Sequence, residues 1–298
     1  MYTDEIISFG PGNSNSGILT LPESMQLDTI CCIFLNAGII HRVGPNEVFV
    51  KISRILVKKG IASLRFDICG VGDSTPNNIE SRTVIEEIDE AIQIVRKQYN
   101  LNKIILIGMC SSTLSAYQYA IKKDGVRGLI IIEGVIENEE NLKRLIYLAH
   151  YNTTVRYYRK NLFQFNKYKR IFTGKTLIMK FLYRLVLNVF KKIIWRKEKE
   201  GMQKEQLDRK LFNQEEILKL SKRKTNILFC FAEGSHIYNI YKRSILNILK
   251  SVNNEFENIS FKYFKGADHV FTPIFAQQEL SECIQKWLEG INNEDIVT

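Results

Sequence analysis

The sequence predicts an α/β protein with a mostly parallel central sheet, flanking helices and one inserted helical segment. Short β-rich runs alternate with helical patterns, which is typical of parallel strands joined by crossover helices. The spacing between strands is short except for one interval of about 90 residues. The chain has 298 residues, 45% of them apolar, which is enough for one large domain with an insertion or for two small domains. This composition excludes disordered and collagen-like chains.

Seven runs rich in β-branched and aromatic residues are predicted to be strands. In chain order they are Gly17–Leu21, Thr29–Leu35, Ala62–Phe66, Lys103–Ile107, Gly128–Ile132, Asn226–Phe231 and Ile259–Phe264. Four segments between or after them are predicted to be helices, because their apolar residues recur at helical spacing. They are Glu47–Lys58, Thr83–Gln98, Ser112–Lys122 and Pro273–Leu288.

The charge is distributed unevenly along the chain. The formal net charge is +10, from 42 lysines and arginines against 32 aspartates and glutamates. Between Asn141 and Lys224 there are 23 basic and 6 acidic residues, a net charge of +17, so the remainder carries −7. The sequence therefore predicts an acidic core over residues 1–136 and 225–298, and a basic, aromatic-rich helical cap over residues 137–224.

The basic segment has three interpretations. Interleaved aromatic and basic side chains can bind single-stranded nucleic acid, but no recognised binding motif accompanies them, so this interpretation is disfavoured. The stretch Leu177–Trp195 could be an amphipathic helix on an anionic membrane. It contains Lys180, Arg184, Lys191 and Lys192 and is too charged to span a bilayer. We favour a cap helix with one apolar and one solvated basic face.

Other targeting, metal and cofactor signals are missing from the sequence. Residues 1–10 contain Asp4 and Glu5 and do not resemble a signal peptide. The six cysteines have no metal-ligand spacing, which disfavours both a zinc site and a disulfide framework. We expect a cytoplasmic protein without cofactor or metal, with peripheral membrane binding through the cap as an alternative.

The segment Lys103–Ser112 carries the strongest chemical signal. A strand ends in Gly108, a single turn carries Cys110, and a helix begins at once. This is the layout of a nucleophile elbow, in which small flanking residues permit a tight turn, although Ser112 stands where glycine is commonest. The helix N-terminus favours a thiolate and so lowers the pKa of Cys110. The alternative is that Cys110 is a small buried apolar residue.

A histidine follows the last predicted strand. His269 lies in the segment Phe264–Phe271, between that strand and the last helix, where a triad histidine belongs in the chain order nucleophile, acid, histidine. Its imidazole could take the thiol proton of Cys110 and later donate it to a leaving group or activate water. The alternative is a loop histidine with structural hydrogen bonds.

Two glycine-containing turns follow earlier strands. The turn after Leu35 faces the elbow in this topology, so the backbone N–H of Gly38 or Ile39 is expected to join that of Ser111 in an oxyanion hole. The turn Cys69–Ser74 contains Gly-Val-Gly, but it lacks the third glycine and the following helix of a dinucleotide-binding loop.

With these motifs, the run LNAGIIHRVGPNEVFVKISRILVKKGIASLRFDICGVGDS, followed by GMCSS and GADHVF, resembles the α/β-hydrolase superfamily. Within it the sequence is similar to the group related to serine aminopeptidases and to hydrolases that accompany bacterial exosortase systems, with cysteine in the elbow. Dienelactone hydrolases also have a cysteine nucleophile but fit less well. The resemblance covers about two thirds of the chain and implies an eight-stranded sheet, Cys110 as nucleophile and His269 as base.

The acid of the implied triad departs from the family pattern. The usual aspartate position, after the strand Asn226–Phe231, aligns with Ser235. Two substitutes are available: Glu133 at the end of the preceding strand, which we favour, and Glu233. A Cys-His dyad without an acid is a third possibility, because cysteine needs less activation than serine. Asp268 is expected to point away from the imidazole of His269 and to be structural.

The sequence thus predicts a cysteine-nucleophile acyl hydrolase or acyltransferase that forms an acyl-Cys110 intermediate on an ester or thioester. If the cap lies over Cys110, its basic exterior would attract an acidic partner, such as coenzyme A or an acidic carrier protein. The alternatives are a catalytically silent α/β-hydrolase fold used for binding or membrane association, and a peptidase or lactone hydrolase.

Overall fold

The computed structural model describes residues 2–26, 28–76, 82–134, 214–233, 235, 238 and 258–294. The contacts between Cα atoms divide the chain into two compact units, Met1–Glu137 with Phe212–Thr298, and Asn138–Leu211. The expected cap, residues 137–224, lies outside the described residues except for 214–224. The stretch Leu177–Trp195 also lies outside them. Within the described ranges, no helix is both long and apolar enough to cross a membrane.

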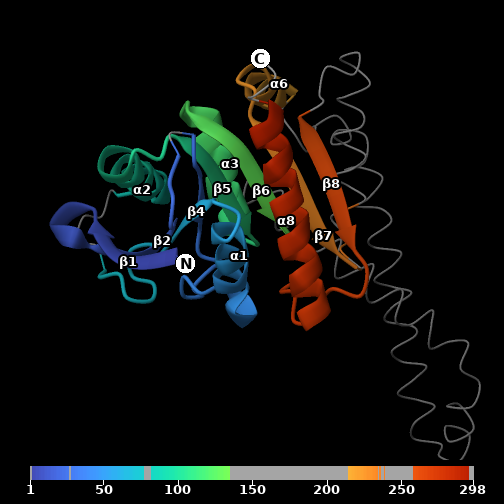
Figure 1. Cartoon of the computed structure of the whole chain (residues 1–298), viewed down its shortest axis with the longest axis horizontal. Helices are drawn as coiled ribbons and strands as arrows, with labels where there is room; N and C mark the ends of the chain where they lie inside the picture. The colour runs from blue at the N-terminus through green and yellow to red at the C-terminus, as the bar shows by residue number, and fades with distance from the viewer. Residues whose placement is uncertain are drawn as a thin grey trace, which may run out of the picture. The chain divides into compact units, whose positions relative to one another are not determined.

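Eight strands form one sheet in the order β1-β2-β4-β3-β5-β6-β7-β8 (Figure 1). Their bounds are β1 Tyr2–Phe9, β2 Asn15–Pro22, β3 Ile30–Phe34, β4 Ala62–Phe66, β5 Lys103–Met109, β6 Val126–Ile132, β7 Asn226–Ala232 and β8 Ile259–Phe264. The pairs β1–β2 and β2–β4 are antiparallel, and all the other pairs are parallel. The predicted mostly parallel sheet is confirmed.

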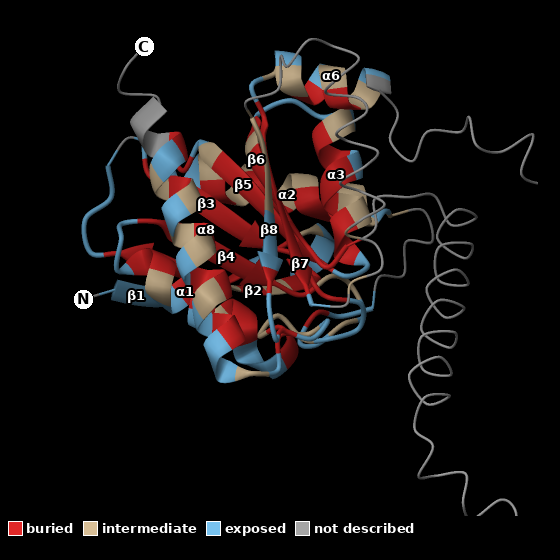
Figure 2. Cartoon of the chain, turned by 90° about the vertical axis from the view of Figure 1, so that its right-hand side faces the viewer, coloured by how far each residue is buried: buried red, intermediate tan, exposed pale blue. Residues whose placement is uncertain are grey.

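Helices cover both faces of the sheet (Figures 1 and 2). The helices α1 (Val48–Val57) and α8 (Ile274–Glu294) lie on one face, and α2 (Val84–Tyr99), α3 (Ser112–Lys122) and α6 (Gln214–Lys222) lie on the other. Two short 3-10 helices, Pro11–Asn13 and Pro45–Glu47, precede β2 and α1. Every residue of β3, β4 and β7 is buried between the two layers, whereas the edge strand β8 is largely solvent-accessible. Figure 2 shows the same contrast in red and pale blue.

The helix α2 shows why the sequence pattern located the helices well. Thr83 forms a capping box, in which its side chain accepts from the backbone N–H of Glu86 and the Glu86 carboxylate accepts from the backbone N–H of Thr83. The apolar residues of one face are buried or half-buried: Val84, Ile88, Ala91, Ile92 and Val95. Capping therefore fixes where the helix begins, and burial of one face fixes its orientation.

The strand β1 and the two 3-10 helices were not predicted, and α6 was predicted only as part of the helical cap. The strand β1 contains Asp4 and Glu5 and pairs only with β2, so its sequence lacks the apolar run of a buried strand. The helix α6 falls inside the basic segment that we assigned to the cap, but it belongs to the same compact unit as the sheet and contacts α3.

The carboxyl ends of the parallel strands gather at one edge of the sheet. Met109 of β5 pairs with Ile132 of β6, and Ile132 pairs with Cys230 of β7. The residues that follow β5 and β6 are Cys110 and Glu133, so the register alone places these two side by side. Parallel α/β sheets bind their ligands at this edge.

Candidate active site

Cys110 occupies a sharp turn between β5 and α3. Its backbone is left-handed, with φ of 57°, a conformation that non-glycine residues seldom adopt. Its backbone N–H donates to the carbonyl of Ile132, 3.0 Å away, which fastens the turn to the neighbouring strand. A Cβ atom at Gly108 would lie 2.8 Å from Cα of Thr113, so only glycine lets α3 begin this close to β5. The thiol is exposed at the strand edge.

Ser112 replaces the glycine that is commonest at its position, and its hydroxyl stabilises the turn. The Oγ atom accepts from the backbone N–H of Met109 at 2.9 Å. It also lies 3.0 Å from the carbonyl of Met109 and 3.3 Å from that of Leu35, at the end of β3. The serine thus connects the elbow to the start of the loop that was predicted to hold oxyanion donors.

His269 lies on the loop after β8 and meets Glu133 from the end of β6. Its Nδ1 atom is 3.0 Å from Oε2 of Glu133. A carboxylate only accepts hydrogen bonds, so Nδ1 carries the proton, which leaves Nε2 for an interaction with Cys110. The second carboxylate oxygen, Oε1, accepts from the backbone N–H of Ala232 in β7. The Glu133 side chain is 5% exposed and that of His269 is 52% exposed.

The loop that carries His269 is fixed on both sides. Phe271 is fully buried and packs edge-on against Phe264, with ring centroids 5.3 Å apart. Asp268 accepts from the backbone N–H of Thr272 at 2.8 Å, which lowers the pKa of its carboxyl group. Asp268 therefore stabilises the turn, as expected. Phe271 orients the loop so that the imidazole of His269 stands over the strand edge.

Cys110 and His269 shift each other's pKa values. The hydrogen bond from His269 is the main cause that lowers the pKa of the Cys110 thiol below its ordinary value of 9.0. Partial burial opposes this shift, and the backbone N–H of Ser111 supports it. The same pair, followed by the hydrogen bond to Glu133, raises the pKa of His269 to about 10. The two side chains therefore favour a thiolate and an imidazolium.

The structure separates the two candidate acids. Glu133 contacts the imidazole of His269, whereas the carboxylate of Glu233 accepts from the backbone N–H of Gly266 at 2.7 Å and closes the turn after β8. Ser235, at the family's usual acid position, donates its backbone N–H to the carbonyl of Ala232. Glu133, too, has a left-handed backbone, with φ of 48°. This conformation turns its side chain toward β7 and the His269 loop.

The expected oxyanion donors lie beside the elbow. Gly38 has φ of 63°, and a Cβ atom on it would lie 3.8 Å from Oγ of Ser111. Within the described ranges, the backbone N–H groups of Gly38 and Ile39 have no hydrogen-bond acceptor. Ile39 is 91% exposed, so its side chain is largely in solvent.

One buried group near the site was missed by the sequence analysis. Asp67 follows β4 and is fully buried, and its carboxylate is surrounded by Asn36, His41, Arg42 and the backbone of Asp73. The sequence signal was a carboxylate directly after the predicted strand Ala62–Phe66 and two residues before the glycine-containing turn Cys69–Ser74. That turn wraps Asp67, because a Cβ atom on Gly72 would lie 2.3 Å from its Oδ2 atom.

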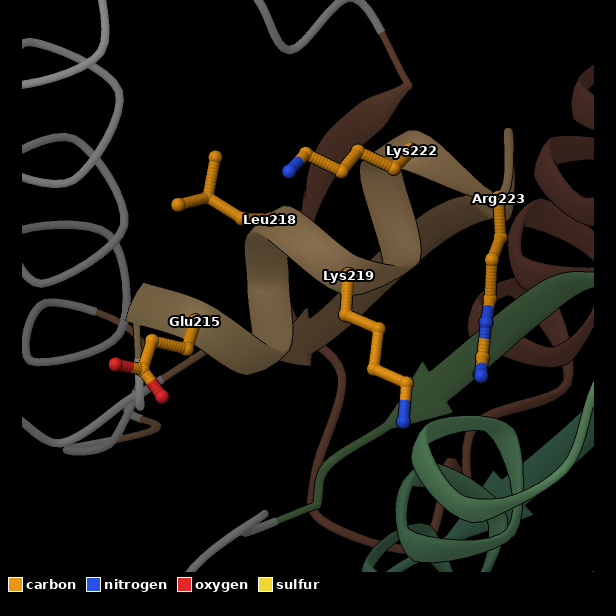
Figure 3. A pocket seen from close by; sticks show the side chains of 5 residues that line it. All are labelled: Glu215, Leu218, Lys219, Lys222 and Arg223. Atoms are coloured by element: carbon orange, nitrogen blue, oxygen red, sulfur yellow. The ribbon is translucent and has the colours of Figure 1, made fainter.

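A shallow hollow of about 400 Å³ lies elsewhere, along α6 (Figure 3). Its lining residues are Glu215, Leu218, Lys219, Lys222 and Arg223. The helix α6 ends just before β7 begins, at the edge of the sheet opposite Cys110. The Arg223 guanidinium is already bound to the carbonyls of Ala120 and Ile121 and to the carboxylate of Asp124. This hollow is distant from the elbow, and the geometry around Cys110 is the better guide to function.

Comparison with known proteins identifies the fold. No protein-family model and no curated protein matches the chain. Among solved structures, the proline iminopeptidase of Mycobacterium smegmatis aligns with a TM-score of 0.56 and 12% identity, over 98% of this chain and 100% of that one. A Pyrococcus furiosus esterase aligns with 0.55 and 16%, over 97% and 90%. The Anabaena variabilis dienelactone hydrolase aligns with 0.52 and 11%, over 97% and 98%.

These alignments, together with the sheet order, define the fold of the chain. It has the α/β-hydrolase fold, with Cys110 in the sharp turn after β5, Glu133 after β6 and His269 after the last strand.

Proposed function

We propose that the protein is a cysteine-dependent acyl hydrolase or acyltransferase that works through an acyl-Cys110 intermediate. The observation that carries the proposal is the chain of contacts Cys110–His269–Glu133, which runs from an exposed thiol to a buried carboxylate. A nucleophile, a base and a group that orients the base are the three parts that acyl transfer requires.

In the proposed acylation step, the Cys110 thiolate, whose proton already lies on Nε2 of the His269 imidazolium, attacks the carbonyl carbon of the substrate. A new C–S bond forms while the carbonyl electrons move to oxygen, where the N–H groups of Ser111 and of Gly38 or Ile39 would stabilise the charge. When the oxyanion collapses, the bond to the leaving group breaks, and His269 returns its proton to the departing thiolate or alkoxide. Glu133 holds the imidazole in the required tautomer.

In the second step the acyl group leaves Cys110. Water, an amine or an alcohol gives its proton to His269 and attacks the acyl carbon, and the Cys110–acyl bond breaks. Cys110 leaves as a thiolate beside the protonated His269, which restores the starting ion pair. Hydrolase and acyltransferase share the first step and differ only in the acceptor. A thioester suits a cysteine nucleophile, because acyl exchange between two sulfur atoms changes the free energy little.

The alternative of a catalytically silent fold depended on the absent aspartate. The contact between the Glu133 carboxylate and Nδ1 of His269 supports Glu133 in the role of that aspartate, and it therefore favours an enzyme over a silent fold. The solved structures of similar fold include an esterase, a dienelactone hydrolase and a proline iminopeptidase, and the substrate panel should therefore span esters, lactones and peptides. The motif GMCSS supports a further proposal, that this chain belongs with the cysteine-containing members of the exosortase-associated hydrolases.

The direct test is detection of the acyl-enzyme. The full chain, incubated with a panel of short thioesters, esters, lactones and peptides, should gain the mass of one acyl group on Cys110, as mapped by peptide mass spectrometry. Thioesters should react fastest. Cys110→Ala should gain none, whereas Cys69→Ala, at another incompletely buried cysteine, should react like the natural chain. If no substrate acylates Cys110, or if the adduct persists in Cys110→Ala, the proposal fails.

We further propose that the acyl group arrives on an acidic carrier, either coenzyme A or an acidic carrier protein. The proposal rests on sequence, because residues 141–224 carry a net charge of +17 while the remainder of the chain carries −7. Opposite charges accelerate encounter and are screened by salt.

The carrier proposal predicts a salt effect that depends on the substrate. Raising ionic strength from about 0.05 to 0.5 M should lower kcat/KM about tenfold or more for a coenzyme A or carrier-bound thioester. It should leave a neutral thioester of the same acyl group nearly unchanged. The double variant Lys191→Glu and Lys192→Glu should reproduce this loss at low salt for the charged substrate alone. Equal salt dependence for both substrates would remove the electrostatic argument.

A further inference from the structure

Asp67 holds both ends of the loop that faces Cys110. Its Oδ1 atom accepts from Nδ2 of Asn36 at 2.9 Å and from the backbone N–H of Arg42 at 2.6 Å. Between these two contacts lie Gly38 and Ile39, whose N–H groups are the expected oxyanion donors. One buried carboxylate oxygen thus clamps the residues on either side of the donors.

The other oxygen of Asp67 is equally occupied. Its Oδ2 atom accepts from Nη1 of Arg42 at 2.5 Å and from the backbone N–H of Asp73 at 3.2 Å, and Nε2 of His41 is 3.4 Å away. Arg42 reaches Asp73 with its second nitrogen at 2.6 Å. A cluster of His41, Asp67 and Asp73 could in principle hold a metal ion, but the Arg42 guanidinium already provides the cation between the two carboxylates.

Asn36 completes the clamp. Its Oδ1 atom accepts from the backbone N–H of Ile68 at 2.7 Å, and its Nδ2 atom also donates to the carbonyl of Ile40 at 2.9 Å. The preceding residue, Leu35, is bound to β5 through the carbonyl of Ile107 at 3.0 Å. Hydrogen bonds therefore attach the loop both to β5, the strand before Cys110, and to the turn after β4.

We propose that Asp67 is a positioning residue, whose bonds to Asn36 and Arg42 hold the N–H groups of Gly38 and Ile39 at the place where an oxyanion would form on a substrate acylating Cys110. The inference rests on the proposed function. Asp67 itself touches no reacting atom. Because preorganised donors lose their value when they shift by fractions of an ångström, a loosened loop slows the step that develops negative charge on oxygen.

The test compares two reactions of the same thiol. Acylation of Cys110 by a thioester develops an oxyanion, whereas alkylation by iodoacetamide displaces iodide and develops none. Asp67→Asn keeps the shape of the side chain but turns an amide NH₂ toward one of the donors. Acylation should slow about 10- to 100-fold with little change in KM. Alkylation should stay within about twofold of the natural chain.

Two more variants keep the test decisive. Asp73→Asn makes the same chemical change at the exposed carboxylate of the Arg42 pair, 61% exposed, and should leave the ratio of acylation to alkylation unchanged. Asn36→Ala removes one end of the clamp and keeps the ion pair, so it should lower the ratio even if Asp67→Asn fails to fold.

The two proposals fail in different ways. If the natural chain cannot be acylated, the proposed function is wrong. If the natural chain is acylated but the ratio of acylation to alkylation is unchanged in both Asn36→Ala and folded Asp67→Asn, the role of Asp67 is wrong. A parallel fall in both reactions would reduce Asp67 to a purely structural residue and would also overturn the inference.

Discussion

Replacing His269 with alanine should slow both turnover and the alkylation of Cys110 at neutral pH. The hydrogen bond from His269 is the main cause of the lowered pKa of Cys110, so its loss should move that pKa upward and reduce the thiolate fraction at pH 7. Turnover should fall by roughly 10³-fold or more, because the variant loses the proton carrier as well as the thiolate.

The pH profiles of alkylation and of turnover should both change in His269→Ala. In the natural chain, the rate of alkylation should rise with pH through an inflection below 9.0, where the Cys110 thiol becomes a thiolate. Turnover should decline again above pH about 10, where His269 loses the proton that it donates to the leaving group. In His269→Ala the alkylation inflection should move to higher pH, and the upper limb of turnover should disappear.

The other cysteines serve as internal controls for alkylation. Cys31, Cys32 and Cys230 are buried, and burial raises the pKa of each thiol, that of Cys31 to about 12. Cys283 is half-buried, and a hydrogen bond with Cys230 lowers its pKa, so its peptide should be followed separately. An unchanged inflection at Cys110 in His269→Ala would contradict the proposed pair.

Replacing Glu133 with glutamine should lower kcat by roughly 10²-fold or more. Glutamine preserves the volume, and its oxygen can still accept from the Ala232 N–H, but its NH₂ group would then face the N–H of His269 Nδ1. Two donors cannot pair, so the tautomer that leaves Nε2 free as a base is destabilised. The pKa of His269 should also fall from about 10, which moves the upper limb of the turnover profile to lower pH.

Glu233→Gln is the matched control for Glu133→Gln. Glu233 is exposed, and its carboxylate accepts from the backbone N–H of Gly266, a bond that the glutamine oxygen can keep. Its kcat should stay within about threefold of the natural chain, since its amide replaces a carboxylate that does not contact His269. If Glu233→Gln were the more damaging change, or if Glu133→Gln left kcat and the pH profile intact, Glu133 could not be the acid.

The parts of the fold that depend on buried periodic patterns could be predicted from the sequence. Runs of apolar and β-branched residues identify the strands Lys103–Met109 and Ala62–Phe66. Apolar residues at helical spacing and a capping residue identify the helix α2. The strand β1 could not be found in this way, because it is paired on one side only and carries Asp4 and Glu5. For α6 the local composition was misleading, since its lysines continue the basic segment.

The sequence could nominate single residues of the site but could not give the contacts between them. The elbow and the loop histidine follow from chain order, so the sequence alone nominates Cys110 and His269. The sequence favours Glu133 over Glu233 by its place at the end of a strand, but the contact of Glu133 with His269 depends on the backbone conformation there, which the sequence does not specify. The role of Asp67 depends on two loops, after β3 and β4, that meet only in the folded chain.

The two left-handed residues at the ends of β5 and β6 have a consequence for the thermal stability of the protein. Cys110 and Glu133 each hold a conformation that costs an L-residue about 1–2 kcal/mol, against a typical domain stability of about 5–15 kcal/mol. Glycine would relieve that cost at either position and would delete the thiol or the carboxylate. Laboratory evolution for heat resistance alone would therefore be drawn toward inactivating substitutions at these two positions, and such a selection should include an activity screen.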